Sequence, residues 1–183
     1  MLAETFPTGR FDQLGDRLSD GNGTGAHTAT LAFYTQRPFW LATGRILRAR
    51  LNLSWSSSDR VDIRDASVYG TGSGFRGQAT PGESFEVDLG AEYSLSSQWV
   101  LAMDIDYLHG ASTTVLGTYP PVQGGPLVTF ADHSGTSQSL SVAPAVEYNW
   151  NASVGVIAGV IVPVSGRNTA AGYTPTIALN MYY

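Results

Sequence analysis

The chain has 183 residues, a formal net charge of −5, no cysteine and 21 glycines. This length fits one domain of ordinary size, so residues 1–183 are treated as a single domain. The absence of cysteine excludes disulfide scaffolds and thiolate zinc sites, and an acidic chain without a basic cluster argues against a nucleic-acid partner. The longest apolar stretch, Val154–Val164, has 11 residues, about half of the ~20 that a membrane-spanning helix needs.

Apolar residues recur at every second position over most of the chain, which is the pattern of β-strands rather than helices. In residues 85–95, for example, Phe, Val, Leu, Ala, Tyr and Leu alternate with charged and small residues. The pattern predicts strands at 2–8, 28–34, 46–55, 85–95, 99–107, 139–148, 154–164 and from 174 to the end.

Two kinds of connection alternate between these strands. Short turns are expected near 41–44, 96–98 and 149–151, and long, polar, glycine-rich loops at 9–25, 56–82 and 110–135, with a medium loop at 165–173. We therefore predict an all-β fold: an up-and-down antiparallel β-barrel of about eight strands, with the long loops at one end.

The barrel is predicted to be transmembrane, although alternation alone leaves a soluble, lipocalin-like barrel open. Each strand offers about 9–11 alternating residues, which suffices to cross an outer membrane when tilted. Aromatic residues lie at both ends of the strands, as membrane interfaces favour. The expected interface aromatics are Trp40, Trp99, Trp150 and Tyr183 on the short-turn side, and Trp55 and Tyr107 on the other. The residues expected to face lipid are Leu51, Leu53, Val87, Leu89, Leu101, Met103, Val142, Val146, Val156, Leu179 and Met181.

Charged residues occupy the opposite face, which would line the lumen. The expected polar network comprises Arg48, Arg50, Glu86, Asp88, Glu92, Asp104, Asp106 and Glu147. Arginine forks should contact the carboxylates, because an unpaired charge in a narrow interior is costly. The network could be a gate or selectivity element, or it could be the packing of a narrow lumen. For a closed eight-stranded barrel the second interpretation is favoured, since side chains fill its interior.

Other motifs point to chemistry only weakly. His109 has Asp106 and Ser112 nearby, as in a Ser-His-Asp hydrolase, but His109 and Asp106 have opposite strand parity, so their side chains should diverge. The glycine-rich run 70–77 lacks the strand-to-helix context of a phosphate loop, and Asp59, Asp62 and Asp65 fit solvated loop charges better than an ion site. We assign no catalytic, cofactor or metal site and expect no enzyme activity.

The runs FPTGRFDQLGDRLSDGNGTGAH (6–27) and VLAMDIDYLHG (100–110) resemble the MetA-pathway phenol-degradation family of outer-membrane transporters. The ending TIALNMYY is similar to the terminal aromatic strand by which bacterial outer-membrane barrels are recognised for insertion. The resemblance implies a bacterial outer-membrane location and uptake of small aromatic or apolar compounds. Family members are longer, with more strands upstream, so this chain could be the C-terminal part of a larger barrel, and it lacks a recognisable signal peptide.

These observations lead to three hypotheses. The first is a passive channel or transporter for small solutes, the second is a structural or anchoring barrel with an occluded lumen, and the third is an outer-membrane enzyme. The expected partners are the lipid bilayer, lipopolysaccharide and, through the C-terminal strand, the barrel-assembly machinery. The sequence leaves the solute and the direction of transport open.

Overall fold

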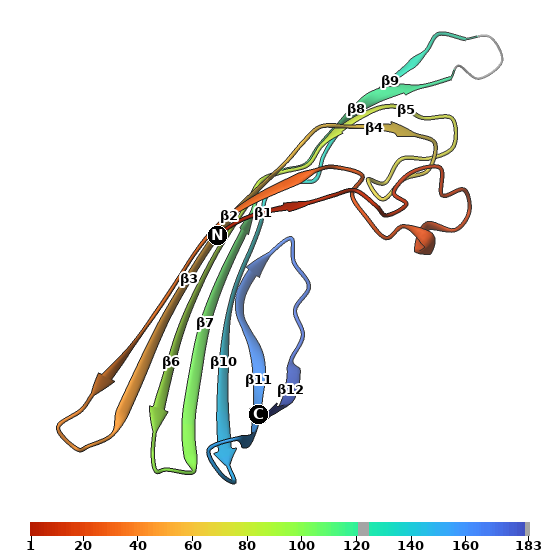
Figure 1. Cartoon of the computed structure of the whole chain (residues 1–183). Helices are drawn as coiled ribbons and strands as arrows, with labels where there is room; N and C mark the ends of the chain where they lie inside the picture. The colour runs from red at the N-terminus through yellow and green to blue at the C-terminus, as the bar shows by residue number, and fades with distance from the viewer. Residues whose placement is uncertain (121–124, 182–183) are drawn as a thin grey trace.

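The structure, a computed structural model, describes residues 1–120 and 125–181 (Figure 1). Within them, strands form two antiparallel sheets beside a short 3-10 helix, η1 (Leu18–Asp20). The large sheet comprises β1 (Leu2–Thr5), β2 (Thr28–Trp40), β3 (Ile46–Ser58), β6 (Ser84–Ser94), β7 (Trp99–Gly110), β10 (Ser137–Asn149), β11 (Val154–Arg167) and β12 (Thr174–Met181). The small sheet comprises β4 (Val61–Arg64), β5 (Arg76–Thr80), β8 (Thr114–Tyr119) and β9 (Val128–His133).

The eight strands predicted from alternation all form and make up the large sheet, which confirms the all-β antiparallel class. Most of them are longer than predicted, whereas β1 ends at Thr5 instead of Thr8. The largest extension is in β2, which continues to Trp40 through Pro38. Proline lacks an N–H and is tolerated in strands whose outer edge is unpaired, and β1 does not cover this part of β2.

The large sheet is a meander, in which each strand pairs with the preceding large-sheet strand in the order β1-β2-β3-β6-β7-β10-β11-β12. The predicted short turns join β2 to β3, β6 to β7 and β10 to β11. The long connections leave the other end of the sheet, and the small sheet extends beyond that end (Figure 1). The predicted division into a short-turn end and a long-loop end is therefore confirmed.

The described residues form an open sheet and not the closed barrel that was predicted. Within residues 1–120 and 125–181, β1 and β12 are the two outer strands and do not pair with each other. The short β1, together with the strand directions, explains why the edges do not match. Every neighbouring pair is antiparallel, so β2 and β12 run in the same direction and only an oppositely directed strand can continue the pattern beside β2. β1 is such a strand, but it covers only Thr28–Leu31 of β2 and leaves Phe33–Trp40 beyond its reach.

The small sheet was missed at the sequence level, where residues 56–82 and 110–135 were predicted to be loops. Its core contains Phe75 and Ile63, which are 0% and 1% exposed, together with Ala79 and Val115. The Phe75 ring makes edge-to-face contacts with Tyr119 and Phe130, at centroid distances of 5.3 and 5.6 Å. The long connections thus form a packed unit with its own apolar core.

Glycine makes this packing possible. Gly77 on β5 pairs with Gly117 on β8, and a Cβ atom on either would lie 2.5–2.6 Å from Cζ of Phe75. Because such a distance is too short for two carbon atoms, only glycine at both positions leaves room for the ring.

The segment between β1 and β2 packs on the small sheet's loops. Leu14 donates its N–H to the Ala66 carbonyl (3.0 Å), and Val68 donates to the Phe11 carbonyl (2.9 Å). Burial raises the pKa of the Tyr69 phenol, whose hydroxyl donates to the carbonyl oxygen of Thr24 (2.6 Å).

Across the described ranges, none of the helical structure is long and apolar enough to span a membrane.

Candidate functional site

The strand register places the charged residues of the predicted network on one face of the large sheet, which we call the polar face. Arg48 pairs with Glu92, and Asp88 lies between Asn52 on one side and Asp106 on the other. Because alternate residues share a face, Arg50, Glu86, Asp104 and Glu147 have the same orientation. Two arginines against six carboxylates give these eight side chains a formal charge of −4.

Arg50 is the centre of this face. Its Nη2 donates to Oδ1 of Asp104 across a distance of 3.0 Å, and its Nε lies 3.7 Å from Oδ2 of Asp88. Arg50 and Asp104 lie on strands that are not neighbours, since β6 runs between them. The ion pair therefore ties β3 to β7 across an intervening strand.

Gly90 of β6 makes this contact possible. Gly90 pairs with Arg50 on one side and with Asp104 on the other, so the three residues form one row across the sheet. A Cβ atom on Gly90 would lie 2.7 Å from Oδ1 of Asp104 and 3.0 Å from Nη2 of Arg50. The role of Gly90 could not be predicted from the sequence, because it depends on the register of three strands; a glycine inside an alternating strand was the available signal.

The other members of the network divide into those that contact an arginine and those that do not. Arg48 donates to Oε2 of Glu92 (2.9 Å), and Asn52, which the sequence analysis did not select, donates to Oδ2 of Asp88 (2.7 Å). Glu86 accepts from Ser54 (3.5 Å) and Glu147 from Asn180 (3.3 Å), so both bond to neutral side chains.

Like charges meet around Asp106 on the polar face, where the carboxylates of both Glu86 and Asp88 lie near it. Asp88 and Asp106 are direct cross-strand partners, and in the described part of the chain Asp106 forms no ion pair with an arginine. Opposed like charges destabilise a strand pair by a few tenths of a kcal/mol to about 1 kcal/mol. The arrangement is therefore better suited to attracting cations than to maximising stability.

The other side of the large sheet, the apolar face, carries all the residues predicted to face lipid. Cross-strand pairs such as Leu53 with Val87 and Val156 with Leu179 join them directly. Exposure along β7 alternates: Leu101, Met103 and Ile105 are 45%, 42% and 42% exposed, while the residues between them are half-buried. In this stretch of β7 the apolar side chains are thus the more exposed set, the reverse of the pattern in a soluble protein.

Aromatic residues mark both ends of the apolar face. At the short-turn end, the rings of Trp99 and Tyr148 contact each other in a tilted arrangement with centroids 4.7 Å apart, and the Trp150 ring lies edge-on to Tyr148 with centroids 5.7 Å apart. The prediction that Trp99 and Trp150 share one end is confirmed. At the other end Trp55 pairs with Leu31 and Phe85.

The remaining predicted aromatics have different outcomes. Tyr107 lies on the apolar face opposite Val87. Trp40 ends β2 at the short-turn end as expected, but it pairs with Ile46 and therefore has the parity of the polar face, whereas its neighbour Phe39 has that of the apolar face. Tyr183 lies outside the described residues.

The residues of the hydrolase motif do not come together. His109 pairs with Phe85 on the apolar face, whereas Asp106 is on the polar face, as their parity predicted. The Oγ of Ser112 instead accepts the N–H of Gly135 (3.1 Å). No group of three or more His, Asp or Glu side chains in the described ranges is placed to hold a metal ion.

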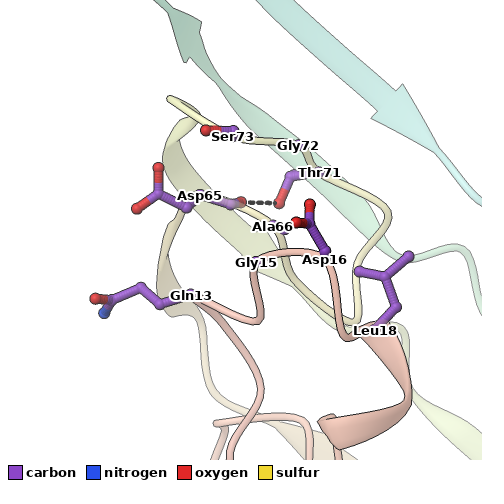
Figure 2. A pocket seen from close by; sticks show the side chains of 9 residues that line it. All are labelled: Gln13, Gly15, Asp16, Leu18, Asp65, Ala66, Thr71, Gly72 and Ser73. Carbon is purple, nitrogen blue, oxygen red and sulfur yellow. Dashed lines mark hydrogen bonds between the residues drawn. The ribbon is translucent and has the colours of Figure 1, made fainter.

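A second candidate site is a pocket of about 630 Å³ between the β1–β2 connection and the β4–β5 loop (Figure 2). Figure 2 shows Asp16 pointing toward Thr71, whereas Gln13 and Asp65 project to one side. Thr71 donates its hydroxyl to the Asp65 carbonyl (2.6 Å) and is therefore engaged within the protein. Because a single charged group converges on this pocket, it is a weaker site than the polar face.

Comparison of the chain with protein-family models and with curated proteins finds no match. The assignment of a function therefore depends on the geometry of the two sheets.

Proposed function

We propose that the large sheet is part of the wall of a bacterial outer-membrane β-barrel through which small solutes pass. The observation that carries the proposal is the exposure pattern of β7, in which apolar side chains are exposed and carboxylates on the other face are half-buried. Lipid favours the apolar face, and an aqueous lumen favours the polar face. The aromatic residues at both ends of the apolar face support the same orientation.

The open edges favour a barrel wider than eight strands. Unpaired backbone N–H and C=O groups are too costly in lipid for an open sheet edge to persist there. Phe33–Trp40 of β2 lies beyond the reach of β1, and β12 could meet it only in the parallel direction. An antiparallel strand from outside the described sheet would complete this edge. A wider barrel leaves room for a path between the polar side chains, whereas eight strands would not.

The absence of native cysteine allows a clean test of the membrane orientation. Leu101→Cys and Ala102→Cys lie one residue apart on opposite faces of β7, so each serves as the other's control. With a fluorescent label attached in lipid vesicles, the label at position 101 should be quenched by nitroxide lipids and that at 102 by iodide. Quenching of both labels by iodide alone would support the soluble alternative.

Planar-bilayer recording tests the path itself. The formal charge of −4 on the polar face predicts a steady, cation-selective conductance, and Asp88→Asn with Asp106→Asn should lower the ratio of cation to anion permeability. Asp62→Asn, in the small sheet, is the matched control and should leave this ratio unchanged. Anion selectivity, or equal loss in the control, would contradict a conducting polar face. The sequence resemblance makes small aromatic and apolar compounds the first solutes to test.

The Arg50 network supports a second candidate, a structural barrel with an occluded lumen. Its contacts reach across three strands and would block a narrow interior. This candidate predicts little conductance until Arg48 and Arg50 are both replaced by alanine. Steady conductance from the unmodified chain would exclude it.

A further inference from the structure

The small sheet carries two arginines side by side. Arg64 on β4 and Arg76 on β5 are direct cross-strand partners, and Arg76 pairs on its other side with Thr118 of β8. Within the described residues, neither guanidinium group takes part in a hydrogen bond or an ion pair. Directly opposed like charges are destabilising, and a bound anion would remove that penalty.

The two arginines line a pocket of about 340 Å³ whose other walls are largely apolar. Pro120 and the exposed Leu127 provide its apolar surface, whereas Phe75 lies beneath it in the core of the small sheet and is 0% exposed. The volume is within the range of small-molecule sites, and apolar walls with a few convergent polar groups are typical of such sites. Guanidinium groups match the geometry of carboxylate and phosphate oxygens through paired N–H donors.

One carboxylate also borders the pocket and must be counted. Asp65 accepts the N–H of Gly74 through Oδ1 (2.8 Å), so one of its oxygens is already engaged by the backbone. With two guanidinium groups and one carboxylate, the lining retains a net positive charge. The pocket therefore favours an anion, unlike the polar face of the large sheet.

We propose that this pocket binds a small organic anion with a carboxylate or phosphate group for Arg64 and Arg76 and an apolar body for Pro120 and Leu127. The site lies on the small sheet, away from the polar face, and does not depend on the solute path. Its ligand class follows from the juxtaposition of an unpaired arginine row and an apolar wall.

Titration calorimetry of the full chain in detergent tests the site with four probes: hexanoate, hexyl phosphate, inorganic phosphate and hexanol. Hexanoate or hexyl phosphate should bind more tightly than inorganic phosphate and hexanol, and the stronger of the two identifies the head group. Arg64→Gln and Arg76→Gln should each weaken that binding roughly 5- to 10-fold, the scale of a charge-assisted hydrogen bond at a partly exposed site.

Arg60→Gln is the matched control, because Arg60 belongs to the same sheet region, donates to Gln78 (3.4 Å) and does not line the pocket. It should bind as the parent does. Changes in the NMR chemical shifts of the Gly74 and Thr118 backbone amides on adding the probe would locate the binding at this pocket. Equal binding of hexanol, equal binding of inorganic phosphate, equal weakening in Arg60→Gln, or unchanged binding in both pocket variants would each overturn the proposal. Neither membrane insertion nor conductance enters these measurements, so their outcome is independent of the proposed channel.

Discussion

Replacing Gly90 with valine tests the row that joins Arg50 to Asp104. General strand preferences predict that this change stabilises the protein, since valine favours strands and glycine does not. The structure predicts the opposite sign. A Cβ atom at position 90 would lie 2.7 Å from Oδ1 of Asp104, and the valine methyl groups would extend further into the space the ion pair occupies.

The magnitude follows from the contacts that would be lost. A hydrogen bond between charged groups contributes about 1.5–3 kcal/mol. The side chains of Arg50 and Asp104 are 35% and 39% exposed, so water screens the pair and we take about 1–2 kcal/mol. Replacing glycine in a strand by a residue with a side chain stabilises the fold by roughly 0.5–1 kcal/mol, which offsets part of this loss. Gly90→Val should therefore lower the free energy of unfolding by about 1 kcal/mol.

Urea unfolding of the chain in lipid vesicles, followed by tryptophan fluorescence, measures this change. The same substitution should be neutral or stabilising in a background carrying Arg50→Ala and Asp104→Ala, because no ion pair remains to be displaced. Ala91→Val, the neighbouring position on the apolar face, controls for valine preference and should not destabilise. If Gly90→Val stabilised the parent, or changed both backgrounds equally, the reasoning about this row would fail.

Three further predictions address the two faces and the small sheet. Leu89→Arg should cost ~2–4 kcal/mol of folding free energy in lipid vesicles, whereas Asp88→Asn should not; equal effects would contradict the assignment of faces. Asp106→Asn should stabilise the chain by ~0.2–1 kcal/mol in the same assay by relieving its repulsion from Glu86 and Asp88, and a loss of stability would show that its charge has a partner. Phe75→Ala should destabilise the small sheet by ~3–5 kcal/mol. Hydrogen exchange of the Val115 amide should become faster, while exchange in β7 stays unchanged. Faster exchange in both sheets would show that they unfold together.

Alternation predicted the large sheet because each of its strands separates two environments. A strand with one apolar and one polar face shows a period of two whether lipid or a protein core covers the apolar face. That period places Arg48, Arg50 and the carboxylates on one face, and the meander order brings β3, β6 and β7 together. Alternation does not indicate whether a sheet closes into a barrel, because closure depends on the lengths of the outer strands, and β1 has only 4 residues.

The small sheet escaped prediction because its strands are short and rich in polar residues and glycine. β5 has the sequence RGQAT, in which only Ala79 is buried. Its core depends on Phe75, which lies outside the strands and enters through the Gly77–Gly117 pair. Aromatic residues within otherwise polar connections, such as Tyr119 and Phe130, were the signal that these segments pack.

The two sheets carry opposite charge patterns, and this constrains how they can act together. The polar face presents six carboxylates, whereas the pocket on the small sheet presents Arg64 and Arg76. An anion held by these arginines would be repelled by Asp88 and Asp106 if it moved along the polar face. Binding at the small sheet would therefore serve to hold the anion or to regulate the proposed solute path, and not to pass the anion into that path. If the anion regulated the path, adding hexanoate should change the cation conductance of the parent chain and leave that of Arg76→Gln unaltered; an equal change in both would assign the effect to the bilayer.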